Sequence, residues 1–222
     1  MATAILIGAT GLVGSEILRL LLADGRFGAV VALGRRPTGE RHARLAEHVV
    51  DFGAPASFEE HVRGDVLLSA LGTTIRAAGG AEAQYRVDHD HQLRVAEAAR
   101  RNGVATYVLV SASGASPRSR IFYSRMKGEL ERDAEALGFP RTRILRPGLL
   151  DGTRREHRPG ERWALRIARP LAPVLPASVR PIHAARVARA ALAAALDPAP
   201  GLAVYEGTAL LRLAEAGSGG PR

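Results

Sequence analysis

Short apolar runs along this chain alternate with longer segments in which apolar residues recur every three or four positions. The short runs are rich in Val, Ile and Leu, which is typical of buried strands, and the longer spacing is typical of helices with one apolar face. The runs that we expect to be strands are residues 3–7, 29–33, 48–50, 65–70, 106–110 and 141–145. The segments that we expect to be helices are residues 12–23, 57–62, 81–102 and 123–137.

The alternation of strand and helix predicts an α/β fold with a doubly wound parallel sheet, because parallel strands need crossover helices and such crossovers are right-handed. The pattern is less regular after Pro147. The elements that we expect in this last part are helices at 162–169, 183–196 and 209–216, a proline-interrupted stretch at 170–181, a strand at 202–205 and a frayed tail at 217–222.

Length and composition exclude several classes of protein. The chain has 222 residues, 46% of them hydrophobic, which is enough for one α/β domain. It has no cysteine, so disulfides, cysteine nucleophiles and thiolate metal sites are excluded, and we expect no metal site. No uncharged apolar run reaches 18 residues, so we expect no membrane span. The first residues lack a basic region, and we therefore expect a cytoplasmic protein.

The positive charge is concentrated near the C-terminus. The net charge is +9, and residues 141–189 hold twelve arginines against three acidic residues, which accounts for the whole excess. One interpretation is a solvated surface; another is attraction of an anionic substrate, for which Arg154, Arg155 and Arg158 are the candidates. Binding to nucleic acid or to an acidic membrane is a weaker alternative, since the segment has one aromatic residue, Trp163, and no recognisable nucleic-acid motif.

A glycine motif follows the first expected strand. In Gly8-Ala9-Thr10-Gly11-Leu12-Val13-Gly14, the first glycine allows a tight turn, the second allows close approach to a pyrophosphate, and the third allows close packing of helix and strand. The helix that begins here offers free N–H groups to phosphate oxygens. The residues of this turn that we expect to bind a dinucleotide are Gly8, Thr10, Gly11, Leu12, Val13 and Gly14.

The end of the second expected strand bears on the choice of dinucleotide. An NAD site would hold an acidic residue there, whereas this chain has Arg35 and Arg36. Two guanidinium groups suit a 2′-phosphate through charge-assisted hydrogen bonds, so we expect NADP(H) as the cofactor. A chance pair in an arginine-rich chain is the alternative.

The single lysine of the chain, Lys127, stands four residues after Tyr123. Residues four apart lie on one face of a helix, so the ammonium can favour the ionised form of the phenol and lower its pKa. Such a phenol can act as a general acid or base near neutral pH. A chance spacing in a surface helix is the alternative.

These motifs together resemble the atypical short-chain dehydrogenase/reductases, in particular the branch that includes the HIV Tat-interacting-protein oxidoreductases and their bacterial relatives. The resemblance extends from the N-terminus to about residue 190. The segments that carry it are residues 8–14, 34–36, 51–52, 71–74, 87–88, 111–115, 123–131, 146–150 and 158–161.

The resemblance implies an NAD(P)-binding Rossmann fold and roles for further residues. It implies that Asp51 and Phe52 contact the adenine, although Phe52 could also belong to the core. The residues implied to lie beside the ribose, the pyrophosphate and the nicotinamide are Ala70, Leu71, Gly72, Pro147 and Gly148. The family's catalytic serine could be either Ser111 or Ser113, and the sequence leaves this open.

The function implied is an NADPH-dependent oxidoreductase that acts on a small carbonyl or alcohol substrate. Tyr123 would be the general acid, assisted by Lys127 and one serine. The alternative is an NADPH-binding regulator or scaffold without catalytic activity. We expect a single domain over residues 1–216, with a substrate-capping region at about 148–216.

Other polar residues are expected to be structural. His89 and His91 are two apart on a helix and point in different directions, so a solvated helix face is favoured over a metal site. Glu129 and Glu131 are likewise expected on a solvated face, and His183 is expected to be structural.

Overall fold

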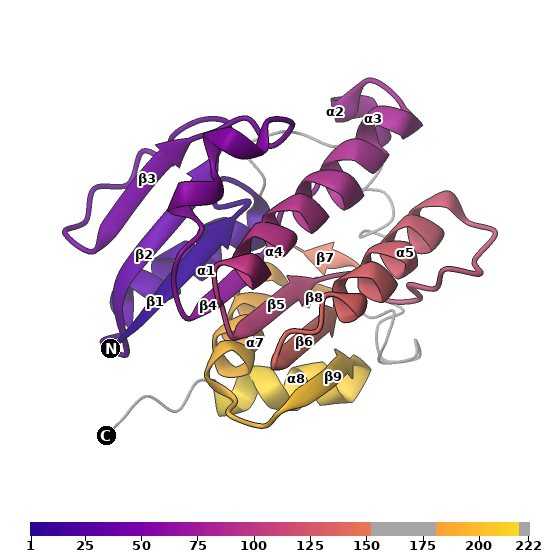
Figure 1. Cartoon of the computed structure of the whole chain (residues 1–222). Helices are drawn as coiled ribbons and strands as arrows, with labels where there is room; N and C mark the ends of the chain where they lie inside the picture. The colour runs from indigo at the N-terminus through magenta and orange to yellow at the C-terminus, as the bar shows by residue number, and fades with distance from the viewer. Residues whose placement is uncertain (152–180, 218–222) are drawn as a thin grey trace.

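A parallel seven-stranded sheet forms the centre of the computed structural model, which describes residues 1–151 and 181–217 (Figure 1). The strand order is β3-β2-β1-β4-β5-β6-β9, and every neighbouring pair is parallel. The strands are β1 (Ala2–Ile7), β2 (Phe27–Gly34), β3 (Leu45–Val49), β4 (Val66–Ser69), β5 (Thr106–Val110), β6 (Arg141–Arg146) and β9 (Gly201–Glu206). This order confirms the predicted doubly wound α/β fold.

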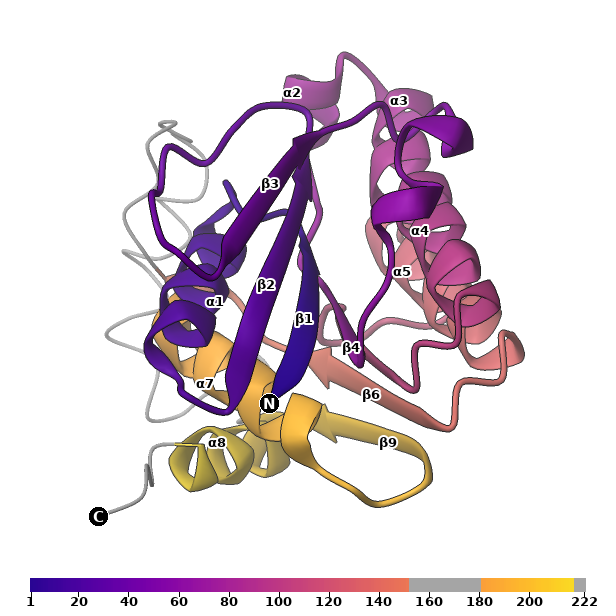
Figure 2. The same ribbon diagram turned by 60° about the vertical axis from the view of Figure 1, so that its left-hand side comes forward.

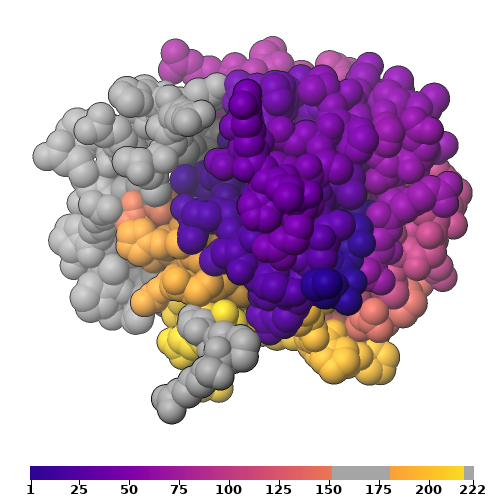
Figure 3. Space-filling model, turned by 90° about the vertical axis from the view of Figure 1, so that its left-hand side faces the viewer, coloured from indigo at the N-terminus to yellow at the C-terminus, as the bar shows by residue number. Residues whose placement is uncertain are grey.

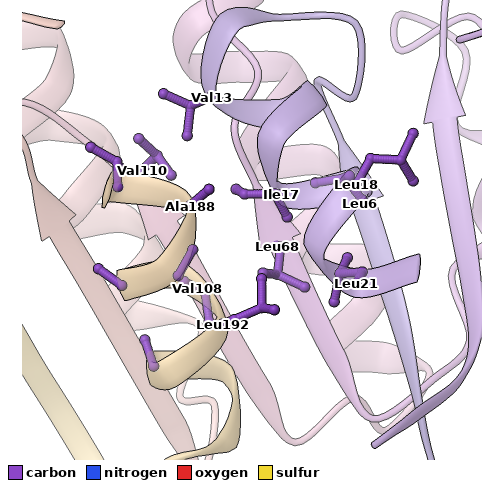
Figure 4. Packing of buried hydrophobic residues seen from close by; sticks show 14 of the residues in the cluster. Leu6, Val13, Ile17, Leu18, Leu21, Leu68, Val108, Val110, Ala188 and Leu192 are labelled. Carbon is purple, nitrogen blue, oxygen red and sulfur yellow. The ribbon is translucent and has the colours of Figure 1, made fainter. Parts of the chain in front are cut away.

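Helices cover both faces of the sheet (Figure 2). One face carries α1 (Leu12–Ala23) and α7 (Ala184–Leu196), with α8 (Gly207–Ala216) packed on α7. The other carries α4 (His91–Arg101) and α5 (Phe122–Ala136). Side chains of α1 and α7 meet over the sheet in one apolar core (Figure 4). The labelled residues of this core are Leu6, Val13, Ile17, Leu18, Leu21, Leu68, Val108, Val110, Ala188 and Leu192.

The order in which strands are added to the sheet reverses at β1. The connection from β1 leads to β2 on one side, and β4 then pairs with β1 on the other. In an open α/β sheet, ligands bind at the carboxyl ends of the strands beside such a switch point. The loop after β1, which contains Gly8, begins at this position.

Strand β3 forms one edge of the sheet, and β9 forms the other. Figure 3 looks onto the β3 side of the molecule, where the visible surface is built largely by the N-terminal part of the chain, coloured indigo and violet. The last strand predicted from the sequence corresponds to β9. It belongs to the main sheet and pairs with β6 from Arg141↔Gly201 to Arg146↔Glu206.

The C-terminal part of the predicted capping region lies within the main layers of the fold. Helix α7 packs against α1, and β9 extends the central sheet. A capping role stays a prediction for the earlier part of that region. There, β7 (Leu150–Asp151) and β8 (Ile182–His183) pair with each other in a separate two-stranded sheet. The expected helix at 162–169 and nearly all of the proline-interrupted stretch at 170–181 lie outside the described residues, as does residue 218 onward of the expected tail.

Two expected helices differ from the prediction. The segment 57–62 forms two 3₁₀ turns, Pro55–Ser57 and Glu59–His61. The segment 81–102 contains α3 (Ala81–Tyr85), a π-helical turn (Arg86–Asp90) and α4 in succession. A π turn adds one residue to the hydrogen-bonded ring, which a 3.6-residue pattern does not reveal. A short helix, α2 (Ile75–Ala78), was not predicted.

Candidate active site

The glycine turn after β1 is packed tightly against the end of β4. Gly8 has φ +85°, and a Cβ on it would lie 2.4 Å from the carbonyl carbon and oxygen of Ala70. A Cβ on Gly14 would lie 2.0 Å from the carbonyl oxygen of Gly8. Because neither position has room for a side chain, the glycines bring Gly8, Ala70 and Leu71 together at the switch point.

Helix α1 begins at this turn with its first N–H groups uncapped. Gly11 is the N-cap residue and makes no side-chain hydrogen bond to the helix. Thr10 and Gly11 are exposed, whereas Val13 is buried below them. The first backbone N–H groups of a helix have no partner within it, and they carry partial positive charge. This end of α1 can therefore bind an anion such as a pyrophosphate.

Arg35 and Arg36 follow β2 and are both exposed. Within the part of the chain that the structure describes, neither guanidinium forms an ion pair. Asp51 is also exposed, and its Oδ1 accepts a 2.8 Å hydrogen bond from the N–H of Gly53. Two guanidinium groups after β2 and one carboxylate after β3 are thus exposed at this edge of the sheet.

Phe52 lies in the core rather than on the surface of this region. Only 1% of its surface is exposed, and its ring centroid is 6.2 Å from that of Phe58 and 6.0 Å from that of His91. Burial, and secondly Arg94, lower the pKa of His91 from its ordinary value. This packing shows that Phe52 belongs to the core. Its contact with an adenine stays a prediction.

Tyr123 and Lys127 lie on the first turns of α5 but in different environments. The tyrosine is 42% exposed, and no described residue hydrogen-bonds its hydroxyl, whereas the lysine is only 3% exposed. The Lys127 Nζ lies 3.9 Å from Oδ2 of Asp88, which is also buried. Oδ1 of Asp88 accepts a 2.6 Å hydrogen bond from the N–H of Thr73. A lysine placed by chance on a surface helix would be solvated; this one is not.

The two candidate serines follow β5, and both donate to carboxylates. The buried Ser111 hydroxyl donates to Oε1 of Glu131, and the half-buried Ser113 hydroxyl donates a 2.7 Å hydrogen bond to Oε1 of Glu206. Arg146 joins the two carboxylates. Its Nε and Nη2 lie 3.0 and 2.5 Å from the oxygens of Glu131, and its Nη1 lies 3.5 Å from Glu206.

This network corrects the expectation that Glu131 belongs to a solvated helix face. Its side chain is buried because Ser111 and Arg146 satisfy its oxygens, and Glu129 accepts a 3.0 Å hydrogen bond from the Tyr85 hydroxyl. The sequence contains one signal of this: Glu131 stands four residues after Lys127, on the same face of α5. Glu206 and Arg146 carry no such local signal.

Pro147 and Gly148 follow β6 directly. Pro147 is buried, and its carbonyl oxygen accepts a 2.8 Å hydrogen bond from the N–H of Ser113. The structure therefore brings the loops after β5 and β6 together. Gly72, after β4, lies beside Asp88, since a Cβ on it would be 3.6 Å from Oδ2 of that residue. The predicted residues from four loops thus gather at the carboxyl edge of the sheet.

The structure also corrects the expectation for His89. It is buried, with its two ring nitrogens 2.9 Å from Asp90 Oδ1 and 3.0 Å from Asp133 Oδ2. His91 points elsewhere, to Phe52, as its spacing predicts. Over residues 1–151 and 181–217, no group of three or more His, Cys, Asp or Glu side chains could hold a metal ion. Over the same ranges no helix is long and apolar enough to cross a membrane. Arg154, Arg155, Arg158 and Trp163 lie outside the described residues.

Comparison with known families fits this geometry. A family model described as NAD(P)H-binding matches residues 8–198. The chain belongs to this NAD(P)H-binding family. Together with the Rossmann architecture, the match confirms the NAD(P)-binding fold that the resemblance to the atypical short-chain dehydrogenase/reductases implies.

Curated relatives cover about three quarters of the chain. "Protein fmp52-1, mitochondrial" of Aspergillus terreus is 45% identical over 174 residues, which are 76% of this chain and 75% of the relative. "Protein FMP52, mitochondrial" of Eremothecium gossypii is 46% identical over 158 residues, 71% of this chain and 70% of the relative. These names place the relatives in mitochondria, which contradicts the predicted cytoplasmic location. The prediction used only the lack of a basic segment in the first residues, which does not determine a compartment.

Solved structures share the fold at low sequence identity. MoeE5 in complex with UDP-glucuronic acid and NAD is 23% identical with a TM-score of 0.74, covering 92% of this chain and 76% of that one. The UDP-glucose 4-epimerase of Thermus thermophilus, in complex with NAD, is 21% identical with a TM-score of 0.71, covering 99% and 85%. At this identity the likeness establishes the Rossmann fold alone.

Proposed function

We propose that the protein is an NADPH-dependent oxidoreductase of the atypical short-chain type, acting on a small carbonyl or alcohol substrate. The observation that carries the proposal is the placement of Lys127. The only lysine of the chain is buried beside Asp88, on the same helix as an exposed tyrosine whose hydroxyl has no partner among the described residues. A nucleotide-binding module without chemistry would not need this arrangement.

Each residue then has a chemical role. NADPH, when bound, supplies a hydride to the substrate carbonyl carbon. Tyr123 gives its phenolic proton to the carbonyl oxygen in the reduction direction, and the Lys127 ammonium stabilises the phenolate that remains. Ser113 is the better candidate for orienting the carbonyl, because its partner Glu206 is partly exposed, whereas Ser111 is enclosed by the buried Glu131.

The preference for NADPH over NADH is supported by Arg35 and Arg36, which are exposed and in no ion pair with a described residue. A charge-assisted contact to a 2′-phosphate would favour NADP(H) by about 1–3 kcal/mol. Calorimetric titration of both nucleotides at one ionic strength measures this difference. Equal affinities would contradict the proposal for the cofactor.

A second candidate function is a regulator or scaffold that binds NADPH without turnover. One observation favours it: both Ser111 and Ser113 already donate their single hydroxyl proton to a carboxylate. Neither can then donate to a substrate carbonyl unless its side chain rotates. If the protein is such a regulator, the wild type has no turnover, and Tyr123→Phe therefore has no activity to lose.

Turnover assays separate the two candidates. NADPH oxidation is followed with a panel of neutral and anionic carbonyl compounds that includes nucleotide sugars, because those are the ligands of the structural neighbours. Anionic substrates are a further proposal, supported by the charge of residues 141–189; it predicts an advantage at low ionic strength that salt removes. Turnover that is lost in Tyr123→Phe, with NADPH binding retained, supports the enzyme. No turnover with any compound supports the regulator.

A further inference from the structure

The π-helical turn Arg86–Asp90 places two adjacent side chains in two different buried environments. Asp88 is 1% exposed and His89 is 6% exposed, although they are neighbours in sequence. The turn packs against α5, the helix that carries Tyr123 and Lys127. π turns within helices occur frequently at functional sites, because the extra residue redirects side chains.

Asp88 faces the candidate active site. Its carboxylate accepts a hydrogen bond from the backbone N–H of Thr73 and lies 3.9 Å from the Lys127 ammonium. Because both charged groups are buried, their separation matters more than it would on the surface. A shift of the π turn would therefore change the position of the negative charge beside Lys127.

His89 joins the same turn to α5 at a second point. Its Nε2 lies 3.0 Å from Asp133 Oδ2, and its Nδ1 lies 2.9 Å from Asp90 Oδ1. Its ring also stacks on Tyr85 at a centroid distance of 4.7 Å. An ionised carboxylate only accepts hydrogen bonds, so both contacts are hydrogen bonds only when both ring nitrogens carry protons.

The other charged groups around His89 are accounted for. Arg132 donates to Asp133, and Glu129 accepts from the Tyr85 hydroxyl. The pKa of Asp133 is held below its ordinary value, first by Arg132 and also by His89. These contacts favour the ionised form of Asp133, whose oxygens then accept hydrogen bonds from the ring of His89.

We propose that His89 and Asp133 are positioning residues for Lys127. In its doubly protonated form, His89 fixes the π turn to α5, and the turn holds Asp88 against the Lys127 ammonium. Removal of either side chain removes the hydrogen bond between the turn and α5 and loosens this arrangement. The kinetic consequence rests on the proposed oxidoreductase function, whereas the effect on Lys127 does not.

The single lysine makes the inference directly measurable. Protein labelled with ¹⁵N only in lysine gives one side-chain signal, that of Lys127, whose position is compared between the wild type and the variants at one pH. The variants are His89→Gln and Asp133→Asn. The control is Tyr85→Phe, which removes a neighbouring hydrogen bond, from α3 to Glu129 of α5, but keeps the aromatic ring against His89.

In Tyr85→Phe, the Lys127 signal should keep its wild-type position. In His89→Gln and Asp133→Asn the signal should be displaced, and kcat should fall by about a hundredfold, since a displacement of about 1 Å at a catalytic group has a cost of this order. Asp133 is 28% exposed, so its variant tests the inference even if His89→Gln does not fold.

A wild-type position of the Lys127 signal in either folded variant overturns the inference. If both variants displace the signal and Tyr85→Phe does not, but no substrate is turned over, the positioning of Lys127 is supported and only the proposed oxidoreductase function fails. The NMR and kinetic measurements therefore report on the two proposals separately.

Discussion

The Ser113 hydroxyl donates a 2.7 Å hydrogen bond to Glu206, which lies 93 positions further along the chain. The contact joins the loop after β5 to the end of β9, the last strand of the sheet. Arg146, at the end of β6, lies between Glu206 and the buried Glu131. One side of the candidate active site is therefore built from three parallel strands and the charges at their carboxyl ends.

The two serines should respond differently to removal of their hydroxyls. Ser113→Ala should reduce kcat by about a hundredfold, the scale of losing one donor to a developing oxyanion, with little effect on stability. Ser111→Ala should instead lower the free energy of unfolding by about 1.5–3 kcal/mol, because it removes a hydrogen bond to a buried charge. Steady-state kinetics and urea unfolding of both variants measure these effects. The reverse pattern would make Ser111 the catalytic serine.

Lys127→Arg keeps the positive charge but should not keep its position. The site is buried, and the longer, planar guanidinium cannot take the place of the ammonium beside Asp88. We expect a fall in kcat of about a hundredfold, within the range attributed to proton-transfer catalysis. Circular dichroism checks that the variant is folded. Wild-type kinetics in this variant would assign Lys127 a purely structural role.

The glycine turn should not tolerate a methyl group. Gly8→Ala places a side chain at φ +85° and 2.4 Å from the Ala70 backbone, so it should lower the free energy of unfolding by about 3 kcal/mol or more and abolish NADPH binding. Gly25→Ala is the matched control, because a Cβ there meets nothing within 4 Å. Thermal melts with and without nucleotide compare the two. Equal melting temperatures would show that the turn can rearrange.

Replacing Arg35 and Arg36 together by alanine should affect NADPH and NADH unequally. The affinity for NADPH should fall by about 1–3 kcal/mol for each guanidinium that binds the 2′-phosphate, whereas the affinity for NADH should change little. Since both side chains are exposed, the melting temperature should be unchanged. Calorimetric titrations give the two affinities. A parallel fall for both nucleotides would show that these arginines do not bind the 2′-phosphate.

His91 should make the protein less stable in mild acid. Its pKa is lowered in the folded state, mainly by burial, so the unfolded chain takes up the proton first as the pH falls below about 6.5. The stability that the neutral ring contributes is complete above that pH and is lost as the pH falls through the folded-state pKa. Melting temperatures at pH 7.5 and pH 5 should differ less in His91→Gln than in the wild type. The same difference in both proteins would exclude His91 as the cause.

The order of elements could be predicted from the sequence because it depends on local patterns. Helix α1 has the predicted bounds, and the buried run Thr106–Val110 is one strand, as predicted. Local periodicity does not reveal the π turn at Arg86–Asp90, whose geometry depends on packing against α5. It also cannot show that the strand at 201–206 pairs with β6 instead of forming part of a cap.

The candidate site was predictable only where chemistry and local spacing coincide. Gly8 and Gly14 stand in one turn, and Tyr123 and Lys127 stand on one helix face, so a short motif identifies each pair. Glu131, Arg146 and Glu206 come from three separate elements, and only the folded chain brings them to the serines. The same reason explains why His89 was expected in solvent: its partner Asp133 is 44 residues away.

The burial of Lys127 has a consequence for how this protein can be modified. Because the chain has no other lysine and Lys127 is only 3% exposed, the folded molecule offers amine-reactive labels and lysine-modifying enzymes no accessible lysine side chain. Acylation of the lysine would require the chain to open first. Its rate of labelling under native conditions is therefore a measure of unfolding, read at the centre of the candidate active site.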